Sequence, residues 1–112
     1  MFSVETISAK MLDYYVDRKD AFIIDLRSRE EYRTGHIKGA ENLPYEEFER
    51  MFEERLQYDF PKGKILILYC DRGGASLRAA RNLAKMGYET RTVIGGMEAY
   101  RGRNLVCEIS VQ

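Results

Sequence analysis

The chain has 112 residues, of which 45% are hydrophobic and 32% charged, and its 18 basic and 18 acidic residues give a formal net charge of zero. This length predicts one domain over residues 1–112, the balanced charge argues against a nucleic-acid partner, and the sequence has neither a membrane span nor a signal-peptide pattern. Two cysteines and one histidine predict neither a disulfide framework nor a metal site, so we expect no cofactor and a reducing, cytoplasmic location.

Helix and strand patterns alternate from the N-terminus onward. Phe2–Glu5 predicts a short strand, and Ser8 is expected to cap a helix whose apolar residues recur at helical spacing. The apolar run Phe22–Asp25 indicates a buried strand. The apolar positions expected on the first helix are Met11, Leu12, Tyr15 and Val16.

A capping box begins the next helix. Ser28 and Glu31 have the spacing at which side chains and backbone amides cap each other, so a short helix is expected to reach about Thr34 and to stop at Gly35. The segment Ala40–Leu43 then predicts a brief strand that is closed by the following proline.

Two glutamates begin the third helix, where carboxylates offset the positive end of the helix dipole. They are Glu46 and Glu47, and the strand Lys64–Tyr69 that follows this helix is the most apolar run of the chain. We therefore expect that strand to lie at the centre of the sheet. The buried face of the third helix is predicted to consist of Phe48, Met51, Phe52 and Leu56.

The last third of the chain continues the alternation. It predicts a helix over Ser76–Met86 that is capped by Gly87, a strand over Glu89–Val93, and a short helix over Met97–Tyr100 after a two-glycine turn. The alternating tail Leu105–Val111 predicts an extra edge strand. The fourth helix is expected to turn Leu77, Ala80, Leu83 and Ala84 inward and Arg78, Arg81 and Lys85 outward.

Apolar strands that alternate with helices predict a parallel α/β sheet covered on both faces, in which ligands bind beyond the carboxyl ends of the strands. Cys70 lies at that position, between the central strand and the loop before the fourth helix. Backbone N–H groups there can converge on its sulfur and hold a thiolate. The alternative is a buried and inert thiol, since unpaired cysteines are often buried.

The loop after Cys70 reads Asp71-Arg72-Gly73-Gly74-Ala75-Ser76. We expect Gly73 and Gly74 to let the backbone curl tightly, through a positive φ or a close approach to a ligand. We expect Ser76 to cap the following helix, with a contact between its hydroxyl and the sulfur of Cys70 as the alternative.

Three segments together resemble the rhodanese (sulfurtransferase) family. The first runs from Asp25 to Pro44 and contains Asp-Leu-Arg, Glu-Tyr and Gly-His-Ile-Lys-Gly-Ala-Glu-Asn-Leu-Pro; the second is the strand that ends in Cys70, with its loop; the third is the segment Gly-Gly-Met-Glu-Ala-Tyr at 95–100. The resemblance spans nearly the whole chain. It implies a three-layer α/β/α sandwich around a five-stranded, mainly parallel sheet.

The resemblance also implies the chemistry of Cys70. The family's cysteine takes a sulfane sulfur from a donor such as thiosulfate, becomes a persulfide, and passes the sulfur to cyanide or a thiol. A free thiol with a pKa of about 8.5 gives little thiolate at neutral pH, so the loop amides are expected to stabilise the anion. The expected partners are a small sulfur donor and acceptor, with a thioredoxin-like or other sulfur-relay protein as a further possibility.

The loop departs from the family at Asp71 and Ala75, positions at which many members carry a basic residue. A carboxylate beside the sulfur disfavours the thiolate and repels thiosulfate. Arg72 supplies the only positive charge of the loop. Our hypothesis is that Arg72 contacts the anion, against the alternative of a solvated surface arginine.

Other residues receive mainly structural interpretations. Asp25 and Arg27 match a pair that the family places around its site, and we expect Asp25 to brace the loop rather than to take part in the chemistry. His36 belongs to the Gly-His-Ile turn, which favours a structural role over that of a general base. Cys107 is expected to be a packed strand residue, with a resolving thiol as the alternative.

Three other functions compete with a small-molecule sulfurtransferase. A phosphatase of this fold needs an arginine six positions after the cysteine, where this chain has Ser76. A regulatory binding module and a partner-specific persulfide carrier with little activity on small substrates both remain open. The basic face of the fourth helix is interpreted as solvated, with docking of an acidic partner protein as the alternative.

Overall fold

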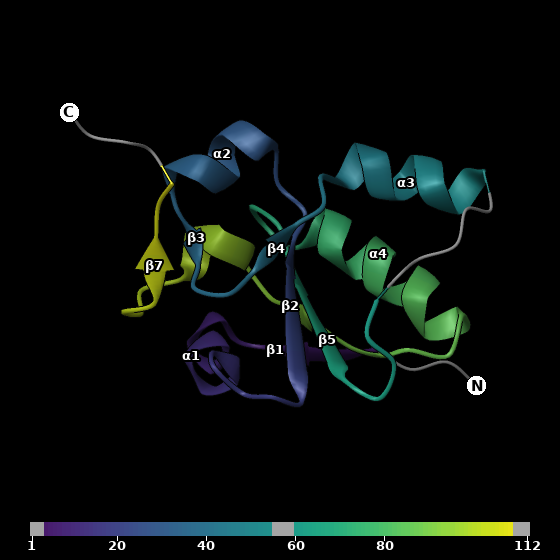
Figure 1. Ribbon diagram of the computed structural model, residues 1–112, viewed down its shortest axis with the longest axis horizontal. Helices are drawn as coiled ribbons and strands as arrows, with labels where there is room; N and C mark the ends of the chain where they lie inside the picture. Colours follow the sequence, from purple (N-terminus) through teal and green to yellow (C-terminus); the bar gives the residue numbers. More distant parts are fainter. Residues whose placement is uncertain (1–3, 55–59, 109–112) are drawn as a thin grey trace.

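Five strands form one central sheet in the computed structural model, which describes residues 4–54 and 60–108 (Figure 1). The strand order is β1-β6-β5-β2-β4, and every neighbouring pair is parallel. This confirms the predicted α/β sheet and places the apolar strand before Cys70 at its centre. The strands are β1 (Glu5–Ile7), β2 (Ala21–Asp25), β4 (Glu41–Asn42), β5 (Ile65–Tyr69) and β6 (Glu89–Val93).

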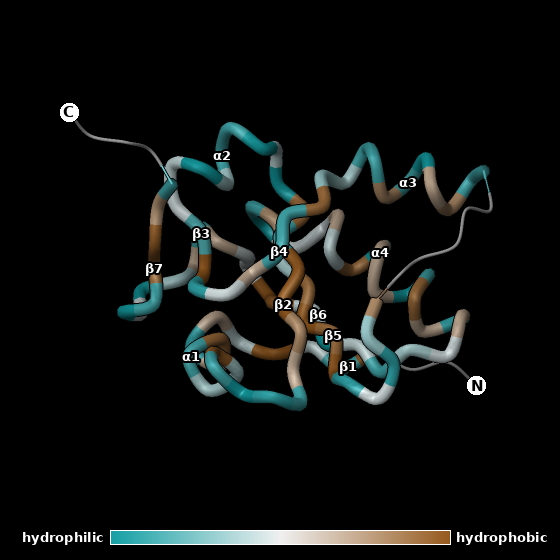
Figure 2. The backbone as a smooth tube through the Cα atoms, in the orientation of Figure 1, coloured by the Kyte–Doolittle hydropathy of each residue, from teal (hydrophilic) through white to brown (hydrophobic). Residues whose placement is uncertain are grey.

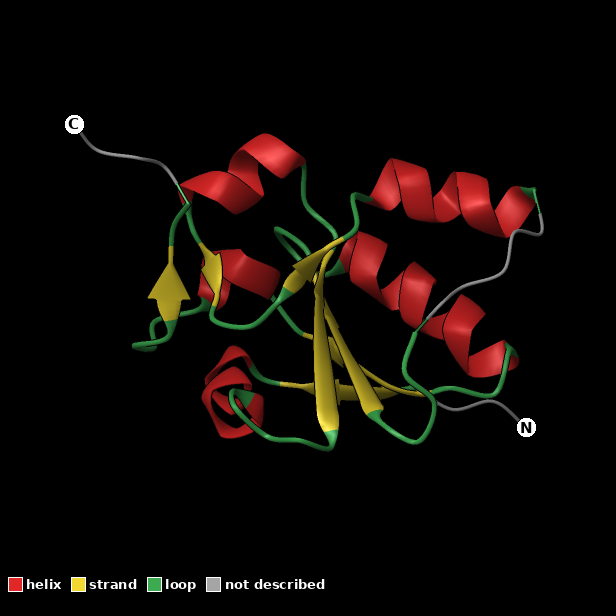
Figure 3. Ribbon diagram, viewed as in Figure 1, coloured by secondary structure: helices red, strands yellow, loops and turns green. Residues whose placement is uncertain are grey.

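Helices cover both faces of this sheet. The helices α3 and α4 lie side by side over one face, and α1 lies on the other side (Figures 1 and 3). The predicted three-layer α/β/α sandwich is therefore confirmed. The helical segments are η1 (Ala9–Met11), α1 (Leu12–Tyr15), α2 (Arg29–Thr34), α3 (Tyr45–Glu53), α4 (Gly74–Lys85) and η2 (Gly96–Ala99).

The sheet separates two apolar cores, and β5 contributes to both because side chains alternate between the faces of a strand. Ile67 and Tyr69 pack with α1, whereas Leu66, Leu68 and Cys70 pack with α3 and α4. The central strands β2 and β5 are accordingly coloured mainly as hydrophobic in Figure 2. Cys70 thus belongs to the core that α4 covers, directly beyond the end of the central strand.

A second, two-stranded sheet lies outside this sandwich. It pairs β3 (His36–Ile37) with β7 (Leu105–Val106) in antiparallel register. The predicted edge strand over Leu105–Val111 is realised only as β7, and residues 109–111 lie outside the described part of the chain. Both residues of β7 are exposed. The alternating residues of the tail therefore form a strand that pairs with β3 and not an edge strand of the main sheet.

Three element predictions need correction. The first strand is Glu5–Ile7 rather than Phe2–Glu5, whose first two residues lie outside the described part. The first helix begins as a 3-10 turn, and Ser8 precedes it without a side-chain capping bond. On α3 Phe48 is buried and Met51 is partly buried against the same core, whereas Phe52 is 38% exposed because this helix packs on α4 along one side; Leu56 is not described.

The capping box predicted for the second helix is confirmed. The Ser28 hydroxyl accepts from the Glu31 amide at 3.1 Å, and Glu31 Oε1 accepts from the Ser28 amide at 3.4 Å. The helix ends at Thr34 with Gly35 as its cap, as expected. Within the described ranges no helix is long and apolar enough to cross a membrane.

Candidate active site

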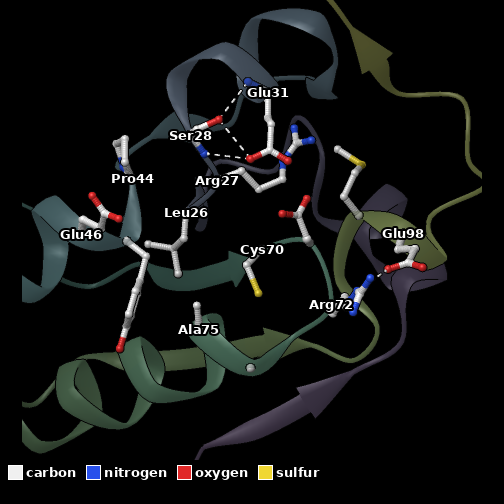
Figure 4. A pocket seen from close by; sticks show the side chains of 14 residues that line it. Leu26, Arg27, Ser28, Glu31, Pro44, Glu46, Cys70, Arg72, Ala75 and Glu98 are labelled. Carbon is white, nitrogen blue, oxygen red and sulfur yellow. Dashed lines mark hydrogen bonds and ion pairs between the residues drawn. The ribbon is translucent and has the colours of Figure 1, made fainter.

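A cavity of about 840 Å³ lies beyond the carboxyl ends of β2 and β5 (Figure 4). Its wall combines residues that follow these strands with the first turns of α2, α3, α4 and η2. The lining residues are Leu26, Arg27, Ser28, Glu31, Pro44, Tyr45, Glu46, Cys70, Asp71, Arg72, Gly74, Ala75, Met97 and Glu98. Segments from several places between residues 26 and 98 therefore meet around Cys70.

Cys70 lines this cavity while only 7% of its surface is exposed. Its Sγ accepts a hydrogen bond from the Gly73 backbone amide at 3.1 Å. Gly73 is the N-cap of α4, with a φ of 111°, so the start of this 12-residue helix lies at the sulfur. An amide donor and a helix N-terminus both favour a negative charge on that atom.

The helices around the cavity differ in how their positive ends are compensated. Acidic residues occupy the first turns of α2, α3 and η2, whereas the first turn of α4 contains none. A first-turn carboxylate offsets the partial positive charge of the helix N-terminus. The N-terminus of α4 therefore remains available to the sulfur of Cys70.

Two backbone hydrogen bonds from η2 fix the start of the loop that contains Cys70 and Asp71. The Met97 amide donates to the Cys70 carbonyl at 2.8 Å, and the Glu98 amide donates to the Asp71 carbonyl at 3.1 Å. This close approach requires Gly96, whose φ is 57° and at which a Cβ would lie 2.3 Å from the Cys70 carbonyl oxygen. The two-glycine segment of the sequence thus sets the position of the Cys70 loop.

Replacing Gly96 with alanine is expected to cost roughly 3 kcal/mol of unfolding free energy, because the new Cβ would collide with the backbone of residues 70 and 71. Gly87→Ala is the matched control, since Gly87 also has a positive φ but has no atom within 4 Å of an added Cβ. Its cost is expected to be about 1 kcal/mol. Urea denaturation measures both values, and equal losses would contradict the proposed close packing.

Ser76 occupies a different place from the one predicted. It lies in the third position of α4 rather than before the helix, and its hydroxyl donates to the Gly73 carbonyl at 3.1 Å. The same oxygen lies 2.7 Å from Thr92 Oγ1 on β6. Both interpretations of Ser76 are wrong, because a buried bond to the sheet turns its hydroxyl away from the cavity and the glycine caps the helix.

A buried polar network underlies the cavity. Asp25 is fully buried and binds Arg27 Nη2 at 2.9 Å and the Tyr69 hydroxyl at 2.6 Å. Arg27 also donates to the Gly35 carbonyl, and the Tyr69 hydroxyl accepts from the Ile37 amide at 3.0 Å. Burial, followed by the charge of Asp25, raises the pKa of Tyr69. The network joins β2, β5 and the Gly-His-Ile turn.

The sequence did not indicate Tyr69 as part of this network, because its place in an apolar run suggested only a core residue. Asp25 was expected to brace the loop. Its buried side chain binds Arg27 and Tyr69, the residue before Cys70, and its backbone carbonyl accepts from the Asn42 side chain at 3.0 Å; bracing of the loop by Asp25 stays a prediction. Arg27 is the member of the pair that reaches the cavity wall.

Asp71 faces a second carboxyl group. The carboxyl group of Glu31, a residue that the sequence indicated only as a helix cap, lies close enough to shift the pKa of Asp71. Burial, followed by the charge of Glu31, raises the pKa of Asp71. Burial opposes ionisation of Glu31 too, but hydrogen bonds from Ser28 outweigh it and lower the pKa of Glu31. Glu31 is therefore the more acidic member of the pair.

Asp71→Asn is expected to stabilise the fold at neutral pH. A raised pKa means that the folded chain binds the Asp71 proton more tightly than the unfolded chain, so ionisation of Asp71 costs stability above that pKa. Allowing for solvent screening of this exposed group, we expect a gain of about 0.5 kcal/mol at pH 7 that vanishes below the ordinary value of 3.8.

Asp20→Asn is the opposite-sign control, because the hydrogen bond from Arg18 lowers the pKa of Asp20. Urea denaturation at several pH values measures the difference for each variant. A variant with asparagine at position 71 that is less stable than wild type at pH 7 would contradict the interpretation.

Arg72 lies at the edge of the cavity. Its side chain is 86% exposed and its Nε binds Glu98 at 3.1 Å. In Figure 4 it points toward Glu98 and away from Cys70. Gly74 and Ala75 line the wall beside the sulfur. Because Ala75 stands where many family members carry a basic residue, the wall has a small apolar surface there. Contact between Arg72 and a bound anion remains a prediction.

The other singled-out residues lie outside the cavity wall. His36 is buried, stacks on Tyr32 at 3.7 Å between ring centres, and places Nδ1 2.7 Å from the Tyr32 carbonyl. Cys107 is exposed rather than packed in a strand. On α4, Arg78, Arg81 and Lys85 are exposed. No group of three or more potential metal ligands occurs among residues 4–54 and 60–108.

Comparison with known proteins identifies the arrangement. The family model of the rhodanese-like domain matches residues 8–103. A solved rhodanese-like domain protein from Staphylococcus aureus superposes with a TM-score of 0.74 at 26% identity, and the match covers 92% of this chain and 97% of that one.

Two curated relatives carry sulfur-transfer names. A tRNA sulfurtransferase of Desulfurococcus amylolyticus is 37% identical over 82 residues, which are 73% of this chain but only 15% of that protein. A thiosulfate sulfurtransferase, GlpE, of Vibrio cholerae is 30% identical over 96 residues, 85% of this chain and 86% of that protein. The chain thus spans a small part of the first relative and most of the second.

Proposed function

This chain belongs to the rhodanese-like domain family, which includes sulfurtransferases, and we propose that it transfers sulfane sulfur through a persulfide on Cys70. The donor is a compound such as thiosulfate, and the acceptor is a thiophile such as cyanide or a thiol. The observation that carries the proposal is the Sγ of Cys70, which lies in the cavity wall with the Gly73 amide 3.1 Å away and the N-terminus of α4 beside it.

The proposed reaction has two steps. The Cys70 thiolate attacks the outer sulfur of thiosulfate, a sulfur–sulfur bond forms, and sulfite leaves with the electrons of the broken bond. An acceptor thiolate then attacks the outer sulfur of the persulfide, and Cys70 leaves as the thiolate. Since each nucleophile is already a thiolate, neither step requires a general base, and since both leaving groups are stable anions, neither requires a general acid; His36 therefore has no part in them.

The Gly73 amide would serve both steps. A backbone N–H that binds the thiolate stabilises the nucleophile before the first step and the leaving group in the second. The absence of a carboxylate from the first turn of α4 supports the same role, because the helix end then keeps its partial positive charge.

A partner-specific persulfide carrier is the second candidate. The observation that favours it is the carboxyl pair of Glu31 and Asp71 in the cavity wall, since a dianionic donor would meet like charge there. A purely regulatory module is less well supported, because Cys70 and its amide donor are present.

Intact mass spectrometry tests the proposal. After exposure to thiosulfate, or to a protein persulfide, the wild-type chain should gain the mass of one sulfur atom, and this gain should be lost on treatment with a reducing thiol. A gain with the protein persulfide alone would favour the carrier. No gain with either donor would overturn persulfide formation.

A further inference from the structure

The charged side chains of the cavity wall are predominantly acidic. They comprise two arginines and four carboxylates, a formal excess of two negative charges: Arg27, Arg72, Glu31, Glu46, Asp71 and Glu98. A cavity with this charge attracts cations and repels anions, although the chain as a whole is neutral.

Both arginines of the wall are already engaged. Arg27 binds the buried carboxylate of Asp25 at 2.9 Å, and Arg72 binds Glu98 at 3.1 Å. Arg27 attracts Glu31 and Asp71 electrostatically, but its guanidinium is bound to other groups. Within the described part of the chain, no arginine or lysine forms an ion pair with Glu31 or Asp71, and both carboxyl groups line the cavity wall.

The position of this pair is fixed from both sides. Ser28 donates its hydroxyl to Glu31 Oε1 at 3.0 Å as part of the capping box, and Asp71 directly follows Cys70 in a loop that η2 holds in place. Figure 4 shows Glu31 on the opposite wall of the cavity from Cys70. Both carboxyl groups therefore line the same cavity as the sulfur of Cys70.

We propose that Glu31 and Asp71 are specificity-determining residues that favour a positively charged sulfur partner over small anionic ones. This inference rests on the sulfur transfer through Cys70 proposed above. The partner that fits is a cysteine thiol on a polypeptide segment with lysine or arginine on both sides. Its cationic side chains would lie against the carboxyl pair while its sulfur reaches Cys70.

The proposed step is the transfer of the outer persulfide sulfur. The partner's thiolate attacks that sulfur and forms a new sulfur–sulfur bond, the bond to Cys70 Sγ breaks, and its electron pair stays on Cys70. The partner leaves as a persulfide. No oxidant or reductant is consumed, because sulfur is only exchanged between two thiolates.

A pair of thiol reagents tests the charge selection without sulfur transfer. A cationic and an anionic methanethiosulfonate of similar size each react with the Cys70 thiolate, form a disulfide and release methanesulfinate. The fraction of Cys70 present as thiolate affects both rate constants equally and cancels in their ratio. The ratio therefore reports the electrostatic potential at the sulfur. The exposed Cys107 is removed beforehand by Cys107→Ser.

In the double variant Glu31→Gln, Asp71→Asn this ratio is expected to fall about tenfold at low ionic strength, as Coulomb's law gives for charges a few ångströms apart in a largely aqueous site. Glutamine preserves the capping box, so the fold should survive. Glu30→Gln, Glu53→Gln is the matched control, since both residues are exposed and lie outside the cavity wall. Its ratio should stay within about twofold of wild type.

Salt provides a second measurement on the wild-type chain. Raising the ionic strength to about 1 M shortens the screening length to about 3 Å, so the ratio should approach that of free cysteine. A ratio that equals that of free cysteine at low salt, or one that the double variant leaves unchanged, would overturn the proposal.

Two acceptor peptides test the partner itself. They are identical except that one cysteine is flanked by lysines in the first and by glutamates in the second. Transfer from persulfidated Cys70 should be about tenfold faster to the lysine peptide, and the double variant should remove that preference. Equal rates in wild type would contradict the inferred partner, whereas failure to form any persulfide would refute the proposed function and leave the reagent ratio interpretable.

Discussion

Cys70→Ser is expected to abolish sulfur transfer, with a loss of at least about a thousandfold in turnover. A serine hydroxyl is not ionised at neutral pH and cannot carry a sulfane sulfur as a persulfide does. The variant keeps the size of the side chain and a group that can accept from the Gly73 amide. The fold should therefore remain intact, and the loss of turnover should come from the chemistry alone.

Cys107→Ser is the control for this experiment. Cys107 is the other cysteine of the chain, and it is exposed and absent from the cavity wall. The Cys107→Ser variant should keep wild-type turnover and should still gain the mass of one sulfur atom in the mass spectrum. If the serine variant at position 70 still gained sulfur, or if the Cys107 variant lost it, Cys70 would not be the sulfur-carrying residue.

Arg27→Met is expected to destabilise the fold by about 3–5 kcal/mol, because it leaves the carboxylate of Asp25 buried without its ion-pair partner. Methionine fills much of the space of the arginine stem, so the cost reflects the uncompensated charge more than lost packing. Urea denaturation at pH 7 measures the change. A loss below 1 kcal/mol would show that the Tyr69 hydroxyl and the backbone amide of residue 27 are sufficient to satisfy Asp25.

Two further variants separate charge from packing. Arg29→Met removes an ion pair with Glu47 in which both side chains are exposed, and it should cost less than about 1 kcal/mol. The double variant Asp25→Asn, Arg27→Met should recover part of the loss, since it removes both members of the buried pair. A double variant no more stable than Arg27→Met would argue against charge burial as the cause.

The sequence was sufficient for the layers of this fold because their signals are local. The run Lys64–Tyr69, the capping box of Ser28 and Glu31, and the outward basic face of α4 each follow from periodicity or cap chemistry over a few residues. The prediction for the C-terminal tail was less accurate because it also depended on a local signal. Its alternation of apolar and polar residues correctly indicated a strand, but the partner of that strand is the two-residue β3, which is too short to show a pattern in the sequence.

The candidate site could be predicted only in part. Cys70 and the two-glycine segment were evident from the sequence. The pairing of Asp71 with Glu31 and of Tyr69 with Asp25 was not, because it joins residues 40 or more positions apart through side chains. Ser76 was misplaced since a glycine with a positive φ begins α4 earlier than a side-chain cap would.

The bonds between η2 and residues 70 and 71 bear on how such a loop could be engineered. Two carbonyls of the loop are occupied by amides from residues 97 and 98, so the loop and the two-glycine segment form one structural unit made from two parts of the chain. A designer who grafts the cysteine loop onto another scaffold must transplant the second segment with it. The loop sequence alone does not encode its own conformation.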